Sequence, residues 1–184
     1  MLEKRSRVSK SQWLDKALEA FEKGGVNAVK IDHLARELGV AKSGFYWHFK
    51  NRGELLNEML EYWEYEYTTS VIHFLENQKE LTAEQQLLTI MRIVRENNMS
   101  CYDLAILSWA TVDEKANEYF QQSYQARYST VKQLFKSLGF KGNDLENRTR
   151  MFVIYESWNQ NVFTHDSDTK LTALEKERLK FYTN

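Results

Sequence analysis

The chain contains 184 residues, of which 42% are apolar and 28% are charged, a composition typical of a globular protein long enough to bury a core. A single cysteine excludes an internal disulfide and fits a reducing cytoplasm, while the lack of proline and the small number of glycines predict an all-α fold. No apolar run approaches the roughly 20 residues that a membrane span needs, and the N-terminus lacks the apolar core of a signal peptide, so we expect a cytoplasmic protein without a membrane partner.

The net charge of −1 conceals two parts of opposite sign. Residues 1–55 contain 11 lysines and arginines against 7 acidic residues, whereas the remaining chain contains 14 against 19. A basic N-terminal part followed by an acidic body is typical of a modular DNA-binding protein. The excess is small, so it supports a nucleic-acid partner only in combination with a motif.

The chain begins with a polar segment and a first helix. Residues 1–9 include three basic side chains, and they are either a solvated end or an arm that reaches the DNA backbone. Ser9 or Ser11 can cap a helix that we expect to end before Gly24-Gly25.

Two short helices joined by a tight turn are predicted next. Apolar residues recur at the spacing of one helix face before the turn, at positions Ile31, Leu34, Ala35 and Leu38. The pattern breaks at Gly39, where a left-handed backbone is cheap only for glycine, and resumes at Phe45. This arrangement predicts a helix-turn-helix unit whose second helix enters a major groove.

The second helix of this unit has an unusual surface. Phe45 and Phe49 are four residues apart and should face inward together, which leaves donors and aromatic side chains outside. Such side chains suit phosphate oxygens, sugar edges and thymine methyl groups, although Tyr46 or Trp47 could instead pack against the next helix. The predicted DNA-binding residues are Lys30, Lys42, Ser43, Gly44, Tyr46, Trp47, His48 and Arg52.

A metal site is not expected in this region. Asp32 and His33 are potential ligands near the start of a helix, but no third ligand lies at a helical spacing from them. We also expect no organic cofactor, because the chain lacks a glycine-rich phosphate loop.

A long helix should then run from Arg52 to about Asn77, carrying an apolar stripe of three- and four-residue spacings. About 25 residues span near 38 Å, which is enough to connect one domain to another. Five further helices follow, and we expect them near residues 82–96, 101–111, 113–138, 143–164 and 172–182. Thr82 should cap the first, and Thr111 or Asp113 the third. The helix over 101–111 is apolar nearly all round, which predicts a central, buried position.

Aromatic residues are frequent on these helices. Tyrosine and tryptophan bring a polar group that needs a partner when buried, so their convergence predicts an internal pocket for an aromatic or amphipathic small molecule. The candidate ligand-binding residues are Trp63, Tyr67, Tyr102, Trp109, Tyr124, Tyr128, Tyr155 and Trp158. Each of them, taken singly, could instead be an ordinary core residue. Cys101 has no basic neighbour in sequence, so we interpret it as a structural or pocket-lining thiol rather than a redox sensor.

The segment from about Ser9 to Leu56 resembles the DNA-binding domain of the TetR family of bacterial repressors. The matching residues are Ala20-Phe21, Gly24-Gly25, Leu34-Ala35, Gly39-Val40, Lys42, Phe45-Tyr46, His48-Phe49 and Glu54-Leu55-Leu56. Three positions differ from the family pattern. Ala41 replaces a serine and removes an N-cap worth about 1 kcal/mol, Gly44 stands where a threonine or asparagine often reads a base, and Arg52 replaces a lysine while keeping its charge.

The resemblance implies a helix-turn-helix domain over residues 1–52 and a helical ligand-binding and dimerisation domain over residues 53–184. It further implies a homodimeric repressor that binds a double-stranded DNA operator and is released by a small-molecule effector. The last two helices would form a four-helix bundle with those of a second copy. An activator, or a DNA-binding protein whose helical half binds another protein, remains an alternative. An enzyme is disfavoured, because no nucleophile motif or metal-spaced His/Cys set occurs.

Overall fold

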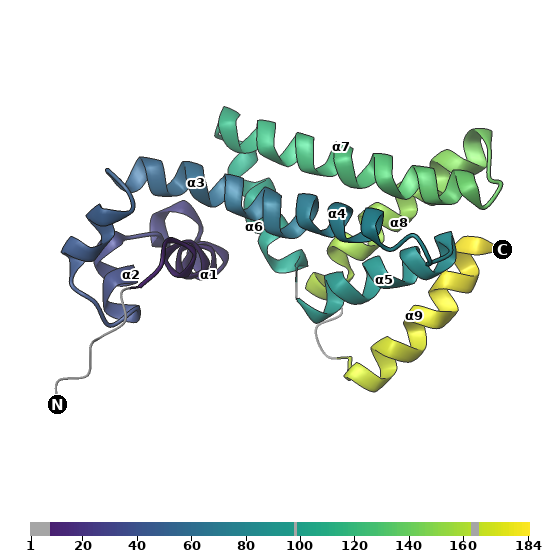
Figure 1. Cartoon of the computed structure of the whole chain (residues 1–184), viewed down its shortest axis with the longest axis horizontal. Coiled ribbons are helices and arrows are strands. Elements are labelled where there is room, and N and C mark those ends of the chain that lie inside the picture. The colour runs from purple at the N-terminus through teal and green to yellow at the C-terminus, as the bar shows by residue number, and fades with distance from the viewer. Residues whose placement is uncertain (1–7, 98, 163–165) are drawn as a thin grey trace. The chain divides into compact units, whose positions relative to one another are not determined.

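The computed structural model describes residues 8–97, 99–162 and 166–184, and within these ranges all regular structure is helical (Figure 1). The predicted all-α fold is thereby confirmed. The basic residues before position 8 and the predicted helix end at Thr164 lie outside the described ranges. None of the described helices combines the length and the apolar content that a membrane crossing requires.

Internal contacts divide the chain into two units, Met1–Trp63 and Glu64–Asn184. The first contains α1 (Lys10–Ala28), α2 (Ile31–Glu37), the short helix η1 (Lys42–Trp47) and nearly all of α3 (Arg52–Glu64). The second contains η2 (Tyr65–Thr69), α4 (Ser70–Asn77), α5 (Ala83–Glu96), α6 (Ser100–Ala110), α7 (Glu114–Ser137), α8 (Gly142–Val162) and α9 (Asp168–Thr183). The sequence predicts a domain boundary after residue 52, whereas the structural division falls after Trp63.

Helix α1 begins where local sequence signals predict, and it is interrupted at the predicted glycines but continues to Ala28. The Ser9 hydroxyl accepts a hydrogen bond from the Gln12 amide at 3.2 Å, and the Gln12 side chain accepts one from the Ser9 amide at 2.8 Å. This reciprocal capping box satisfies two donors that the first helical turn leaves open. Near the other end, Gly24 and Gly25 have non-helical backbone angles, with Gly25 at φ +63°, so they interrupt the helix as expected.

The turn between α2 and η1 has the predicted left-handed glycine. Gly39 lies at φ +66°, and the Val40 amide donates to the Ala35 carbonyl across the turn at 3.0 Å. The second short helix is present as η1, but it is a 3₁₀ helix that ends at Trp47, so Phe49 lies beyond it. Ala41 supplies no capping hydrogen bond, and the serine, glycine and aromatic residues of η1 are poor α-helix formers.

Aromatic rings form the core behind η1. Phe45 and Phe49 are both almost fully buried, as predicted, and their ring centroids lie 5.1 Å apart. The Trp13 ring meets Phe45 edge-on at 5.5 Å, so α1 packs directly against the inner face of η1. This contact fixes η1 on the first unit and leaves its other face outward.

The predicted long helix is helical from Arg52 to Asn77 but is not a single α-helix. Residues Tyr65–Thr69 form a π-helical turn between α3 and α4. The Ser70 hydroxyl donates to the Glu66 carbonyl at 2.6 Å within this segment. An apolar stripe does not distinguish an α-helix with one wider turn from a regular one, which explains why the sequence did not indicate η2.

The second unit is centred on a cluster of apolar side chains from α5, α7, α8 and α9. Its buried members are Leu87, Met91, Val131, Phe135, Leu145, Phe152, Val153 and Tyr182. The caps at Thr82 and Asp113 form as predicted, with their side chains accepting from the backbone three residues later.

The predicted central burial of the helix near 101–111 is wrong. Only Ser100, Asp103 and Ile106 of α6 are buried, and Leu104 is 48% exposed. The reason is that α6 packs against α7 and α8 through one side, which leaves its other apolar side at the surface of the unit.

We predict that Gly39→Ala lowers the free energy of unfolding by roughly 1–2 kcal/mol, because a left-handed backbone is strained once a Cβ is present. A Cβ at position 39 would meet no atom within 4 Å, so the effect isolates backbone strain from steric clash. Gly44→Ala is the control, because its Cβ would lie in ordinary contact with Val40, 3.9 Å away, at a φ that any residue adopts. Urea unfolding of both variants tests this, and equal stabilities would contradict it.

Candidate functional site

The outer face of η1 carries polar and aromatic side chains with high exposure. Tyr46 is 55% exposed and Trp47 is 72% exposed, and Lys42 and Ser43 are exposed beside them. Gly44 is half-buried, with Val40 and Trp13 behind it. These residues therefore lie on one short element whose inner face is anchored by Phe45, and whether they contact DNA stays a prediction.

Lys42 forms an ion pair with Asp32 on α2. The two groups are 2.9 Å apart and both are largely exposed, and the hydrogen bond to Asp32 raises the pKa of Lys42 above its usual value. His33, the neighbour of Asp32, interacts with the Arg36 guanidinium at 3.0 Å. Asp32 and His33, at which no metal site was expected, therefore take part in side-chain contacts with two cations.

Two further predicted DNA-binding residues, Arg52 and His48, also have partners inside the first unit. The Arg52 guanidinium donates to the backbone carbonyls of Val29, at 2.6 Å, and Val26. The His48 ring interacts with the Val8 carbonyl at 2.9 Å. Arg52 thus satisfies carbonyls where the chain leaves α1, a structural role that its charge alone did not indicate. Lys30 is the exposed N-cap residue of α2.

The second unit contains a partly open cavity of about 60 Å³ between η2, α4, α5, α6, α7 and α8. The surface of its wall is mostly apolar. The lining residues are Tyr67, Thr68, Val71, Ile72, Leu75, Ile90, Val94, Met99, Asp103, Arg127, Thr130, Val131, Phe152, Val153, Glu156 and Ser157.

A buried ion pair forms one part of this wall. The Arg127 guanidinium binds both oxygens of Asp103, at 2.5 and 3.2 Å, and also donates to the Thr68 hydroxyl at 2.9 Å. The Tyr124 hydroxyl donates to Asp103 at 3.1 Å, and burial raises the pKa of this tyrosine. The negative charge of Asp103 stabilises the charged form of Arg127 against its desolvation, so the pKa of Arg127 remains above its usual value.

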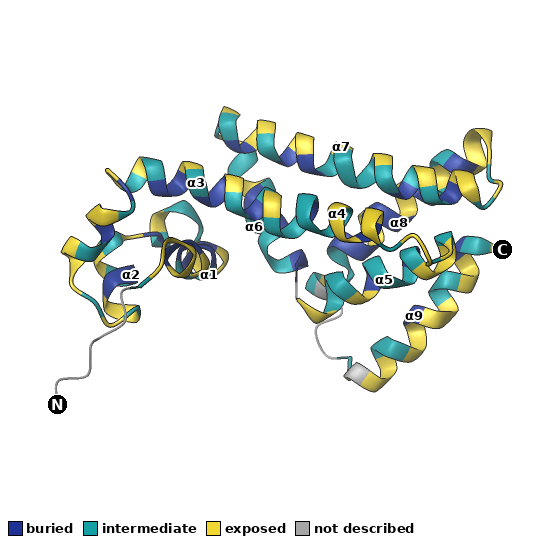
Figure 2. Ribbon diagram, in the orientation of Figure 1, coloured by how far each residue is buried: buried dark blue, intermediate teal, exposed yellow. Residues whose placement is uncertain are grey.

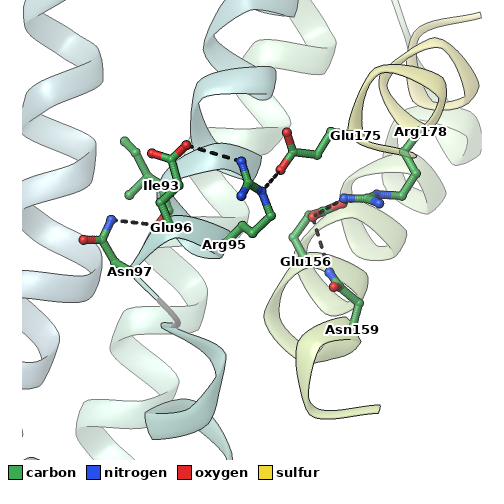
Figure 3. Close-up of polar contacts among 8 residues, drawn as sticks. All are labelled: Ile93, Arg95, Glu96, Asn97, Glu156, Asn159, Glu175 and Arg178. Carbon is green, nitrogen blue, oxygen red and sulfur yellow. Dashed lines mark hydrogen bonds and ion pairs between the residues drawn. The ribbon is translucent and has the colours of Figure 1, made fainter. Parts of the chain in front are cut away.

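A second ion pair joins the cavity wall to α9. Both oxygens of Glu156 accept hydrogen bonds from Arg178, at 3.1 and 3.3 Å (Figure 3). Burial raises the pKa of Glu156 even though Arg178 opposes this shift. Farther along α9, Glu175 is paired with Arg95 of α5 at 2.5 Å, and its other oxygen is buried without a hydrogen-bond partner in the described part of the chain.

The structure brings together three of the aromatic residues proposed as ligand contacts. Tyr67 lines the cavity, Tyr102 meets the Tyr67 ring at 5.2 Å, and Tyr124 binds the wall residue Asp103. Of the eight proposed residues only Tyr67 belongs to the described wall, because Tyr102 and Tyr124 contact wall residues without lining the cavity themselves. The remaining five are Trp63, Trp109, Tyr128, Tyr155 and Trp158.

These five aromatic residues have other positions. Trp63 is fully buried at the end of the first unit, and Trp109 and Trp158 are half-buried. Tyr128 donates to Glu146, and Tyr155 is 38% exposed beneath the Arg178 guanidinium. The regular spacing of these aromatic residues does not by itself indicate a cavity, because amphipathic helix faces produce the same spacing.

Sequence reasoning missed the charged residues of the wall, Asp103, Arg127 and Glu156. One signal was present, because Asp103 is the single charged residue between Ser100 and Ala110. An acidic residue within so apolar a helix requires a buried partner.

Comparison with known proteins relates the chain to a family. Residues 14–59 match the family described as bacterial regulatory proteins, tetR family. The segment is similar to the HTH-type transcriptional regulator AcrR of Shigella flexneri, with 38% identity over 48 residues, 26% of this chain. The match spans only 22% of that regulator's length.

Similarity of fold extends over nearly the whole chain. The structure of the transcriptional regulator FadR from Bacillus subtilis in complex with stearoyl-CoA matches 96% of this chain and 98% of its own, at a TM-score of 0.68 and 16% identity. A TetR transcriptional regulator from Legionella pneumophila matches 95% of this chain and 96% of its own, at a TM-score of 0.70 and 11% identity. At these identities the likeness establishes the fold.

We predict that Asp103→Ala destabilises the protein by about 3–5 kcal/mol, because it leaves a buried guanidinium without its counter-charge. Asp144→Ala serves as the control, because Asp144 pairs with Arg148 while remaining 57% exposed, and such pairs contribute little. Chemical unfolding monitored by circular dichroism measures both. A similar decrease in the free energy of unfolding in both variants would show that the buried ion pair stabilises the protein no more than the exposed one.

We also predict how Glu156 affects the pH dependence of stability. Because the folded state raises the pKa of Glu156 above 4.5, the folded protein holds this proton more tightly than the unfolded chain. The favourable contribution of protonated Glu156 to the free energy of unfolding is therefore complete below about pH 4.5. It is lost as the pH rises through the folded-state pKa. The free energy of unfolding of Glu156→Gln minus that of the wild type should therefore increase as the pH rises from 4 to 7.

The measurement is urea unfolding of both proteins across this pH range. The loss of the Arg178 partner gives the variant an additional cost, so the informative quantity is the slope of the stability difference against pH and not its absolute value. A stability difference that does not change with pH, or that moves in favour of the wild type, would contradict the raised pKa.

Proposed function

We propose that the chain, whose residues 14–59 match the TetR family of bacterial regulatory proteins, is a cytoplasmic DNA-binding transcriptional repressor that a small ligand releases from its operator. The observation that carries the proposal is the outward face of η1, where Lys42, Ser43, Tyr46 and Trp47 are exposed within the segment that matches the family. Exposed donors and aromatic rings on the second helix of a helix-turn-helix unit suit the major groove.

In this proposal the residues of η1 have different tasks. Lys42 exchanges Asp32 for a phosphate oxygen, which needs little rearrangement because both partners are already exposed. Tyr46 binds the phosphate backbone of the DNA, and Ser43 and Trp47 contact the edges of its bases. Arg52 and His48 hold the chain around η1 through their carbonyl contacts, and any phosphate contact they make would be additional.

A second copy of the chain is the proposed dimer partner, through α8 and α9. Figure 2 shows that much of α9 is exposed, and its buried residues are Glu175 and Tyr182. Exposed apolar side chains occur along both helices, at positions Met151, Ile154, Tyr155, Val162, Leu174 and Phe181. If this surface packs against the same surface of a second copy, the interface has two-fold symmetry. The two η1 helices of the dimer would then contact DNA half-sites about 34–36 Å apart, or a multiple of this distance.

The cavity of the second unit is the proposed effector site. Tyr67 and Thr68 of its wall belong to η2, which follows the unit boundary directly in a run of helical backbone. A ligand that binds one arrangement of this segment better than another would shift the population of DNA-competent molecules. The solved neighbour in complex with stearoyl-CoA supports ligand binding by this fold.

We predict that Tyr46→Ala lowers operator affinity by about ten-fold, equivalent to about 1.4 kcal/mol, without changing thermal stability. The measurement is a gel shift with the DNA immediately upstream of the gene and, if that fails, with sites selected from random DNA. Binding should weaken steeply with salt, and the complex should contain a dimer.

Leu104→Ala is the control, because Leu104 is 48% exposed but lies on α6 of the second unit. Unchanged operator binding by Tyr46→Ala would remove this residue from the interface. The lack of any selected DNA sequence would overturn the proposed function itself.

A further inference from the structure

The charged groups in the wall of the cavity are already paired with other groups of the protein. The side chain of Asp103, which is 2% exposed, accepts two hydrogen bonds from Arg127 and one from Tyr124. A ligand cation would have to compete with a bidentate guanidinium for this carboxylate. Such charge-assisted pairs are among the strongest hydrogen bonds in proteins, so the competition is unfavourable.

The guanidinium group of Arg127 likewise donates its hydrogen bonds to acceptors of the protein itself. Besides Asp103, its guanidinium donates to the Thr68 hydroxyl and, at 3.3 Å, to the Tyr67 carbonyl. A ligand carboxylate that approached Arg127 would lie beside the carboxylate of Asp103, and two like charges in a buried place disfavour each other. The wall therefore offers an anion no favourable position while Asp103 is present.

The carboxylate of Glu156 is hydrogen-bonded by residues that do not line the cavity. Its two oxygens face Arg178 of α9, which does not line the cavity, and Asn159 contacts the same carboxylate at 3.4 Å. Counting these partners, the two carboxylates at the wall are balanced by two guanidinium groups. A charged ligand would lose its hydration without meeting an unpaired opposite charge.

The rest of the wall favours an apolar body. Aliphatic side chains from α4, α5 and α7 surround the space together with Phe152, and the hydroxyls of Thr68, Thr130 and Ser157 supply polar positions among them. The volume of about 60 Å³ is below the roughly 150 Å³ of a cavity that holds benzene, so the flexible Met99 or its neighbours must move to admit even one ring.

We propose that this cavity binds a compact uncharged ligand, an apolar body of about one ring or a short alkyl chain with at most one hydroxyl or carbonyl group. This inference rests on the proposed role of the second unit as the effector site and names the chemical class of the effector. An uncharged ligand leaves both ion pairs intact and gains from the burial of its apolar surface.

The test uses three probes with one ring each that differ in charge: benzyl alcohol, benzoate and benzylammonium. The full-length protein is heated without DNA at pH 7 in the presence of each probe up to about 10 mM, since a single ring is expected to bind with a Kd near the millimolar range. Benzyl alcohol should raise Tm in a saturable manner, and the two ions should bind at least ten-fold more weakly. Equal or tighter binding of either ion, or no rise in Tm with any probe, would overturn the proposal.

Filling variants locate the bound probe. Ile90→Phe and Val94→Phe add volume at the wall and should abolish the response to benzyl alcohol, whereas Val112→Phe, at a position 85% exposed, should not. The Tm of each variant without a probe shows whether it has folded, and two filling positions guard against the failure of one. An undiminished response in both folded filling variants would place the probe elsewhere and overturn the proposal.

A charge variant provides a stricter test. Asp103→Asn removes the counter-charge of Arg127, which stays protonated, so benzoate should now raise Tm more than it does in the wild type. An equal response to benzoate in both proteins would contradict the role of charge pairing in selectivity. Tyr46→Ala should respond to benzyl alcohol like the wild type, so a failure of DNA binding and a failure of the ligand proposal are distinguishable.

Discussion

The second unit depends on one buried guanidinium. Arg127 on α7 binds the carboxylate of Asp103 on α6 and the hydroxyl and carbonyl groups of Thr68 and Tyr67 on η2. A hydrocarbon side chain could fill the same volume, but it would leave the buried carboxylate of Asp103 without its counter-charge, with the Tyr124 hydroxyl remaining as a donor. The same charge therefore determines how three elements pack and which groups the cavity presents to a ligand.

An arginine has a related part in the first unit. Arg52, at the start of α3, donates to carbonyls at the end of α1, and Trp13 of α1 supports Phe45 from behind. The outward face of η1 is therefore held in position by residues that do not belong to it. If η1 binds DNA as proposed, a substitution at Trp13 or Arg52 would alter that binding through the placement of η1, without either side chain contacting DNA.

Features that depend on near neighbours in the chain were predictable from the sequence, and features that depend on distant partners were not. The caps at Ser9 and Thr82 and the left-handed Gly39 follow from residues within a few positions. In contrast, Arg127 and Asp103 are 24 positions apart, and neither surrounding segment specifies the other. For the candidate sites, the basic and aromatic run of η1 was readable because it is contiguous. The cavity wall was not, since six separate elements contribute to it.

The way α9 is attached has a consequence for its local stability. Two arginine–glutamate pairs and Tyr182 hold this helix, one oxygen of Glu175 lacks a hydrogen-bond partner within the described residues, and little apolar surface is buried along its length. Elements with few buried apolar contacts open more often than the rest of a protein. We expect the backbone amides of α9 to exchange with solvent before those of α7. If α9 also contributes to a dimer, subunit dissociation and the fraying of this helix would be linked equilibria, so that dilution of the protein would loosen its C-terminus.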